Sequence, residues 1–247
     1  MAFLRSTIGR KPIFKLLGSG AISLLAIAVL LFFQPRWLLS IVSAIAPGAV
    51  YFRETDDRTI ALTIDDGPDA IATPKILEVL ARHRARATFF LIRSRMSGNE
   101  PLVMQAIREG HELGNHLTQD EPSIDLSPED FEAALLETDA ALSEFTTPRW
   151  MRPGSGWYDR QMIATAQQHG YQVALGSVFP YDTSIPSVRF AARHILANVR
   201  PGDIIVLHDS EGRGERTASV LEIVLPELQS RGYQIVTLSE LFPPSQG

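Results

Sequence analysis

The sequence predicts an α/β fold built on a parallel sheet, and two observations lead to that prediction. From residue 59 onward, short runs rich in β-branched and aromatic residues alternate with amphipathic helical stretches. This alternation is typical of βαβ units, in which a helix links each strand to the next parallel strand. About seven such repeats within about 185 residues favour a barrel over an open sheet, although periodicity alone does not separate the two.

Each predicted strand is a short apolar run followed by a polar residue or a turn signal. The strongest runs are residues 59–64, 87–92, 172–175, 203–207 and 234–237, and weaker ones lie near 111–115 and 149–152. The predicted helices are about 73–83, 100–109, 128–145, 160–169, 187–199 and 216–231. Helix starts carry Thr73-Pro74 and Ser127-Pro128, and Gly110, Gly170 and Gly232 follow helix ends.

The composition excludes several classes of function. The chain has 247 residues, 45% of them hydrophobic, and a net charge of -5. Residues 1–50 carry five basic and no acidic residues, a charge of +5, so the remainder carries -5 minus +5, or -10. An acidic body argues against a nucleic-acid partner, because phosphate binding needs clustered Lys and Arg. The absence of cysteine excludes disulfides, thiolate zinc sites and a Cys nucleophile.

The N-terminal region predicts a membrane anchor. Residues 16–33 hold no charged side chain, and at ~1.5 Å per residue this stretch spans about 27 Å, enough for a bilayer core. Four basic residues precede it, which places the N-terminus in the cytoplasm and the body outside it. We expect 1–50 to form the tail, anchor and juxtamembrane segment, with Arg36 and Trp37 at the interface, and 51–247 to form the globular domain. The alternative is a signal peptide cleaved near Pro47.

The strand at 59–64 ends in two adjacent carboxylates, Asp65 and Asp66, and a Gly-Pro turn follows at once. Because parallel strands present active residues at their C-terminal ends, both carboxylates are expected to reach one cleft there. Two like charges this close resist joint ionisation unless a cation lies nearby. The alternative is that Asp-Asp-Gly-Pro is only a turn.

Other polar residues also follow predicted strands. They are Asn115-His116, Arg152, Asp182 and His208-Asp209. The remaining histidines, His83, His111, His169 and His194, are interpreted as structural. A carboxylate and a histidine with a further oxygen or nitrogen ligand form a divalent site of the zinc or transition-metal type.

Four ordered motifs resemble those of the polysaccharide deacetylase family, the NodB-homology carbohydrate esterases. They are 62–68 (LTIDDGP), 110–116 (GHELGNH), 152–156 (RPGSG) and 201–209 (PGDIIVLHD), and the resemblance covers roughly residues 57–242. It implies a distorted (β/α)7 barrel and metal-assisted removal of acetyl groups from carbohydrate.

The resemblance also implies a role for each matching residue. Asp65 is the expected general base, with Arg152 orienting it, and His208 is the expected general acid, oriented by Asp182. The expected metal ligands are Asp66 and His116, completed by Asp120, and the ion would be Zn²⁺, Mn²⁺, Co²⁺ or Mg²⁺. The backbone N–H of Ser155 stands where the family has an oxyanion donor.

The sequence departs from the family pattern in three places. Asp120 replaces a second histidine four residues after His116, where helical spacing would keep both side chains on one face. The alternative is that Asp120 is a solvated turn residue and that metal binding is weak or lost. Ser155 replaces an aromatic residue, whose place Trp157 or Tyr158 fills unless both belong to the core. Finally, no tryptophan follows Asp182.

Two functions follow from these observations. The first is a membrane-anchored, metal-dependent deacetylase of envelope carbohydrate that contains N-acetylglucosamine, with an O-acetyl esterase as a variant. The second is a catalytically weak or inactive relative that binds glycan. The presence of both Asp65 and His208 favours the first, because a binding module needs neither an acid nor a base.

Overall fold

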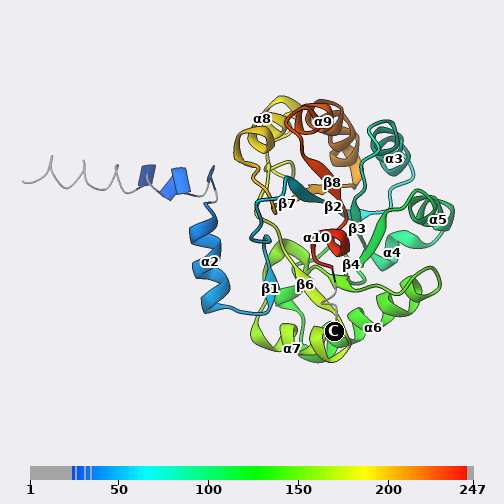
Figure 1. Ribbon diagram of the computed structural model, residues 1–247. Coiled ribbons are helices and arrows are strands. Elements are labelled where there is room, and N and C mark those ends of the chain that lie inside the picture. Colours follow the sequence, from blue (N-terminus) through cyan, green and yellow to red (C-terminus); the bar gives the residue numbers. More distant parts are fainter. Residues whose placement is uncertain (1–23, 26, 31, 34, 244–247) are drawn as a thin grey trace, which may run out of the picture.

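The computed structural model describes residues 24–25, 27–30, 32–33 and 35–243 (Figure 1). Its centre is one parallel sheet with the strand order β1-β6-β5-β4-β3-β2-β7, and β8 pairs with β2 beside this path. The strands are β1 Ala49–Val50, β2 Thr59–Gly67, β3 Thr88–Leu91, β4 Glu112–Asn115, β5 Trp150–Met151, β6 Gln172–Ala174, β7 Ile204–His208 and β8 Gln234–Val236. The predicted α/β class with a parallel sheet is confirmed.

Most of the helices lie around the outside of the curled sheet, whereas the short helix Leu238–Leu241 lies over its middle in this view and Arg36–Ile45 lies to one side, beside β1 (Figure 1). The helices are α2 Arg36–Ile45, α3 Ala72–Arg82, α4 Arg93–Met96, α5 Glu100–Arg108, α6 Pro128–Ser143, α7 Arg160–Gln168, α8 Val188–Asn198, α9 Glu211–Ser230 and α10 Leu238–Leu241, with short 3₁₀ turns at Ser123–Asp125 and Gly154–Gly156. The sheet begins to close on itself where Val178, beyond β6, forms an isolated parallel bridge to Ile205 of β7. The expected barrel is therefore an incompletely closed one.

Strand β2 is the axis of the domain. It pairs with β3, β7 and β8, and all its residues from Ile60 to Gly67 are buried, as its unbroken apolar run predicts. Its register sets Asp65 opposite His208 of β7. The two residues expected to act as base and acid are therefore neighbours across adjacent strands.

Several boundaries differ from the prediction. Strand β2 continues through Asp65 and Asp66 to Gly67, with a register irregularity against β3 that turns the two carboxylates differently. Helix α9 begins at residue 211 rather than 216, because Gly212 and Gly214 gave its first turn a weak helical signal. The two-residue strand β1 was not predicted because it is too short to carry a periodic pattern.

The helix-end signals were mostly correct. Ser127 caps α6 by accepting a hydrogen bond from the Asp130 N–H at 3.1 Å. Gly110, Gly170 and Gly232 all adopt positive φ after their helices, a conformation that other residues rarely adopt. Thr73 is not the cap of α3, which begins one residue earlier, at Ala72.

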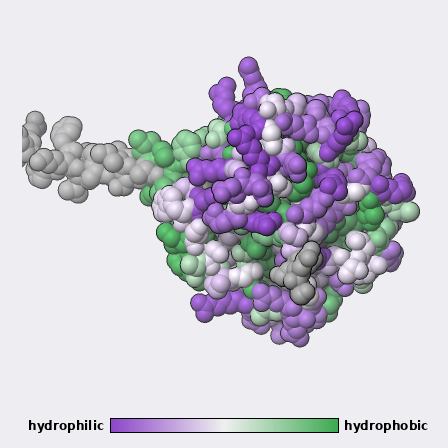
Figure 2. Space-filling view, viewed as in Figure 1, coloured by the Kyte–Doolittle hydropathy of each residue, from purple (hydrophilic) through white to green (hydrophobic). Residues whose placement is uncertain are grey.

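The N-terminal region is described only in part. Most of the expected anchor, residues 16–33, lies outside the described residues, and within the part of the chain that the structure describes no helix meets the length and hydropathy of a membrane span. Helix α2 contacts the body: Arg36 reaches Asp203 at 2.9 Å and lies over the ring of Phe52. On its outer side Trp37 is 56% and Ile45 70% exposed, and Figure 2 shows hydrophobic surface at this side of the molecule.

Candidate active site

A buried ion pair holds Asp65 at the end of β2. Arg152 Nη1 lies 2.6 Å from Asp65 Oδ1 and 2.8 Å from Thr63 Oγ1. The same guanidinium donates to the carbonyl oxygens of Ala174 and Leu175, so every face of its fork is occupied and it cannot turn away from Asp65. Asp65 and Arg152 are each 3% exposed. The structure thus brings together this expected pair, and the role of Asp65 as a base stays a prediction.

A second carboxylate–cation pair holds His208 at the end of β7. Asp182 accepts from His208 Nδ1, with oxygens at 3.0 and 3.1 Å, and also from the His208 backbone N–H at 3.1 Å. Burial alone would lower the pKa of His208, but the hydrogen bond and charge of Asp182, together with the charges of Asp65 and Asp66, raise this pKa to about 9. Because Asp182 engages Nδ1, the proton available to a substrate is the one on Nε2.

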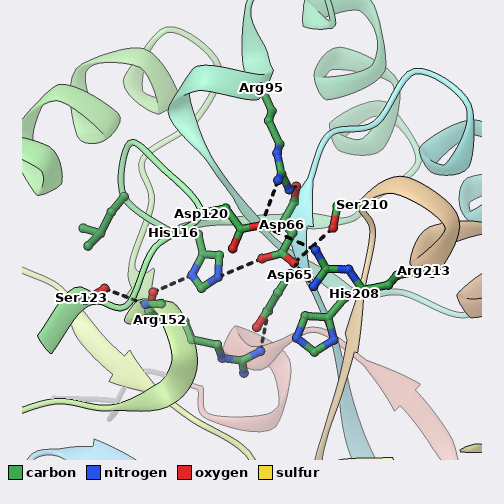
Figure 3. Close-up of polar contacts among 12 residues, drawn as sticks. Asp65, Asp66, Arg95, His116, Asp120, Ser123, Arg152, His208, Ser210 and Arg213 are labelled. Atoms are coloured by element: carbon green, nitrogen blue, oxygen red, sulfur yellow. Dashed lines mark hydrogen bonds and ion pairs between the residues drawn. The ribbon is translucent and has the colours of Figure 1, made fainter. Parts of the chain in front are cut away.

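Asp66 faces His116 on the other side of the cleft (Figure 3). Its φ of 69° turns its side chain away from that of Asp65, and Arg95 Nη1 donates to its carbonyl oxygen at 2.6 Å. Asp66 Oδ1 lies 3.4 Å from His116 Nε2, and Ser210 Oγ lies 3.3 Å from Oδ2. Burial alone would raise the pKa of Asp66, but His116, His208 and Arg213 outweigh burial and lower it.

His116 has the orientation of a metal-binding imidazole. Its Nδ1 donates to the carbonyl oxygen of Arg152 at 2.7 Å, which leaves Nε2 directed at Asp66. Burial would lower the pKa of His116, but the hydrogen bond and charge of Asp66 and the charge of Asp65 raise it. Asp66 and His116 therefore fit two positions of a divalent site.

Asp120 does not have the expected placement. The chain after β4 is not helical, since Leu117 adopts φ 62°, so His116 and Asp120 do not lie on one helical face. The Asp120 side chain is 45% exposed, and its Oδ2 lies 2.9 Å from Arg95 Nη2 and 3.5 Å from Arg213 Nη2. Among the described residues no three His, Cys, Asp or Glu side chains are arranged to hold a metal ion. In this arrangement Asp120 does not fit as the third ligand.

The third motif forms the rim of the site. Ser155 is exposed and has φ 60° within the turn Gly154–Gly156, while Gly154 packs so closely on Glu121 that an added Cβ would lie 2.1 Å from its carbonyl oxygen. Trp157 is 70% exposed and is therefore not a core residue. Tyr158 instead packs inward, with its hydroxyl 2.9 Å from that of Tyr51. A substrate contact for Trp157 stays a prediction.

Sequence reasoning missed two arginines of the site and did not foresee that Asp209 is buried. Arg95 and Arg213 lie in the first turns of α4 and α9, each a few residues beyond a strand end, which is the signal that could have found them. Asp209 is fully buried, is hydrogen-bonded to Thr73 and fits only because Gly67 and Gly214 lack a Cβ. Burial, together with the charges of Asp69 and Asp66, raises its pKa to about 8, against the opposing hydrogen bond from Thr73.

Known proteins share this sequence and fold. The family profile described as polysaccharide deacetylase matches residues 52–174. A peptidoglycan-N-acetylglucosamine deacetylase of Bacillus cereus is 37% identical over 189 residues, covering 75% of this chain and 89% of that protein. A crystal structure of the Bc1960 peptidoglycan N-acetylglucosamine deacetylase has a TM-score of 0.76 and 27% identity, covering 81% of this chain and 94% of that one.

Two further solved structures have this fold, and one of them is an enzyme while the other is a pseudoenzyme. A family 4 acetyl xylan esterase from Clostridium thermocellum, in complex with a cobalt ion, has a TM-score of 0.70 and 30% identity over 74% of this chain and 90% of its own. The BA3943 pseudoenzyme from Bacillus anthracis shares the fold at a TM-score of 0.73 and 23% identity, over 79% of this chain and 69% of its own. The fold alone therefore does not establish catalysis, but the matching profile and the 37% identity establish the lineage. The chain belongs to the polysaccharide deacetylase family of enzymes, as its four motifs predicted.

Proposed function

We propose that this protein hydrolyses the acetamide of N-acetylglucosamine units in a carbohydrate polymer and releases acetate. The observation that carries the proposal is the pairing of Asp65 and His208 across β2 and β7, each with its own buried partner of opposite charge. A carboxylate base and a protonated imidazole that face one cleft are what amide hydrolysis needs.

Asp65 and His208 divide the proton transfers between them. Asp65 takes a proton from the attacking water, and the oxygen of that water bonds to the acetyl carbon. His208 gives its Nε2 proton to the leaving nitrogen as the carbon–nitrogen bond breaks, which yields acetate and a free amine. Arg152 holds the Asp65 carboxylate in place, and Asp182 raises the pKa of His208, which favours its protonated form. In this proposal the backbone N–H of Ser155, which lies in the exposed turn Gly154–Gly156, stabilises the developing oxyanion.

We include a divalent ion of the zinc, manganese, cobalt or magnesium type in this proposal. Asp66 and His116 are the residues that would hold it, and when bound it would polarise the acetyl carbonyl. The support is the orientation of His116 by the Arg152 carbonyl, together with the cobalt complex of the related acetyl xylan esterase. The site of this chain differs in having an aspartate, Asp120, that two arginines hold.

The substrate assignment rests on the relatives. The Bacillus cereus relative is named for peptidoglycan N-acetylglucosamine, whereas the clostridial relative is an acetyl xylan esterase, so an O-acetyl group is the competing leaving site. The second candidate function is a weak or inactive glycan-binding protein. The observation that favours it is the pairing of Asp120 with Arg95 and Arg213 in place of an open ligand position.

We also propose that residues 16–33 anchor the protein in a membrane with its body outside the cytoplasm. The support is the uncharged run, the four basic residues before it and the exposed apolar side chains of α2. Protease added to spheroplasts should degrade the body. A body that is degraded only after lysis would contradict this topology, and a mature N-terminus near residue 47 would show cleavage.

Acetate release is the test of the activity. Purified full-length protein is incubated with N-acetylated chitooligosaccharide, peptidoglycan fragments and O-acetylated xylan, each with Zn²⁺, Mn²⁺, Co²⁺ or Mg²⁺ added in turn. We expect acetate from the N-acetylated substrates with wild type and almost none with Asp65→Asn. Equal acetate from wild type and Asp65→Asn on every substrate would overturn the proposal in favour of the glycan-binding alternative.

A further inference from the structure

The cleft contains a cationic side chain between two of the expected metal ligands. Arg213 Nη1 lies 3.5 Å from Asp66 Oδ2, and Arg213 Nη2 lies 3.5 Å from Asp120 Oδ2. One guanidinium thus bridges two carboxylates that come from different parts of the sheet edge. Figure 3 shows its head directed into the cleft from α9, toward Asp66. We infer that Arg213 is a displaceable counter-cation that competes with a divalent ion for Asp66 and Asp120.

Charge explains why a cation is needed at this position. Asp66 and Asp120 carry two negative charges, and like charges that approach each other in a partly buried site need a positive charge between them. Arg95 and Arg213 supply two positive charges, which balance the negative charges of the two carboxylates. A divalent ion would meet a site that is already compensated, and it binds well only if one of the arginines withdraws.

The contacts identify which arginine withdraws. Arg95 is fixed twice, by its 2.6 Å hydrogen bond to the Asp66 carbonyl and by its 2.9 Å contact with Asp120. Among the described residues, Arg213 makes two ion pairs of 3.5 Å, which are long for charge-assisted hydrogen bonds, and its side chain is 24% exposed. Its neighbours are Gly212 and Gly214, which lower the helix stability of the first turn of α9. Arg213 is therefore the residue that moves.

Geometry makes the two occupants exclusive. Oxygen ligands approach zinc-type ions at about 2.0–2.2 Å, so an ion held by Asp66 and Asp120 would need the carboxylate oxygen atoms that the guanidinium now contacts. The planar fork of an arginine is larger than such an ion and cannot share that space. The bridging position of Arg213 therefore depends on Asp120. A histidine at position 120 would leave the guanidinium without a second carboxylate to contact.

This inference rests on the divalent ion of the proposed function, and its test needs no turnover. Co²⁺ is titrated into chelator-treated full-length protein, and binding is followed by calorimetry and by cobalt absorption. Arg213→Gln should bind Co²⁺ at least about tenfold more tightly than wild type, because the competing charge is gone. Arg193→Gln, which removes the same charge from the exposed face of α8, should bind as wild type does. An affinity for Arg213→Gln equal to or weaker than that of wild type would overturn the inference.

A second measurement uses wild type alone and does not depend on the folding of a variant. Phenylglyoxal modifies accessible arginines, and peptide mass spectrometry reports the rate at Arg213. Co²⁺ should accelerate modification at Arg213 and leave Arg193 unchanged, because a displaced side chain is more exposed. A rate at Arg213 that stays constant or falls with Co²⁺ would overturn the inference. A lack of acetate release in the separate activity test would contradict the proposed function. It would not affect the Co²⁺ affinity of Arg213→Gln or the rate of modification at Arg213, so the two failures can be told apart.

Discussion

The two halves of the cleft are built on different principles. In the proton-transfer half, Asp65 pairs with Arg152 and His208 pairs with Asp182. Asp65, Arg152 and Asp182 are buried, and the His208 side chain is 18% exposed. In the ligand half, Asp66 has His116, Ser210 and Arg213 around it, and Asp120 has two arginines. In the proton-transfer half each proposed catalytic group, Asp65 or His208, has one partner of opposite charge. In the ligand half two arginines, Arg95 and Arg213, contact the carboxylates in addition to the residues of the family motifs.

This difference separates what is fixed from what can change. Arg152 donates four hydrogen bonds, so the geometry around Asp65 is over-determined and does not depend on an ion. Arg213 makes two 3.5 Å contacts from a partly exposed helix start. We infer that the proposed acid and base are preassembled, while the proposed ligand half is adjustable. Variants on the two sides should therefore differ in what they change.

The largest effect is expected from Asp65→Asn compared with Asp66→Asn. Asp65→Asn should lower kcat by about 10²–10⁴-fold and leave Co²⁺ affinity nearly unchanged, because it removes only a proton acceptor. Asp66→Asn should lower Co²⁺ affinity as well as turnover. The measurements are acetate release and calorimetry, with the exposed Asp56→Asn as a charge-matched control. An equal loss of Co²⁺ affinity in Asp65→Asn and Asp66→Asn would contradict the assignment of Asp65 to proton transfer and of Asp66 to metal binding.

Asp182→Asn should move the pH dependence of activity. His208 must be protonated to act as an acid, and its pKa is raised to about 9 chiefly because Asp182 outweighs burial. Without that charge, burial dominates and the pKa falls toward or below 6.5, so the alkaline limb of kcat moves to lower pH. The stabilisation from this pair is complete below the unfolded pKa of 6.5 and is lost as pH rises through about 9. An unchanged alkaline limb would count against this role for His208.

A smaller effect is expected from Asp120→His. This change removes the carboxylate that Arg95 and Arg213 contact and supplies a nitrogen ligand near His116. Co²⁺ should bind more tightly than to wild type, whereas Asp120→Asn, which removes the charge without supplying a nitrogen ligand, should gain less. Weaker binding of Co²⁺ by Asp120→His would mean that the contacts of Asp120 with Arg95 and Arg213 do not oppose metal binding.

The smallest effect is expected from Asp209→Asn, on the pH dependence of stability, because Asp209 is a buried acid. Its pKa is raised to about 8 in the folded protein and is near 3.8 when unfolded, so the folded state binds more protons between these values. Stability at this position is therefore present below pH 3.8 and lost as pH rises toward 8. Asp209→Asn should flatten the fall in Tm between pH 5 and 8 measured by calorimetry. Parallel Tm curves for wild type and variant would refute this assignment.

Much of the fold follows from local sequence. The β-branched run before Asp65, the Ser127 cap and the three glycines after helices each fix one element, because their causes lie within a few residues. The pairs Asp65–Arg152 and His208–Asp182 followed from the motif resemblance, since they lie at strand ends that a parallel sheet must bring together.

The placement of Asp120 did not follow from sequence. Spacing of four residues suggests a helical face, but the left-handed Leu117 directs the chain elsewhere, and its cause is the tertiary pairing of 117–118 with the start of α4. The arginines of the ligand half come from α4 and α9, far from Asp120 in sequence, so no local pattern links them to it. The ion pairs of Asp120 with Arg95 and Arg213 join residues far apart in the chain, and they could not be predicted from the sequence.

We predict that His208, opposite Asp65, is already protonated before any ion or substrate binds. The direct measurement is an NMR titration of the His208 imidazole in chelator-treated full-length protein, with Asp182→Asn used to assign the resonance. The account predicts a pKa of about 9 for His208 in wild type and a fall in the variant. A wild-type His208 that titrates at or below 6.5, the ordinary value for histidine, would contradict the account.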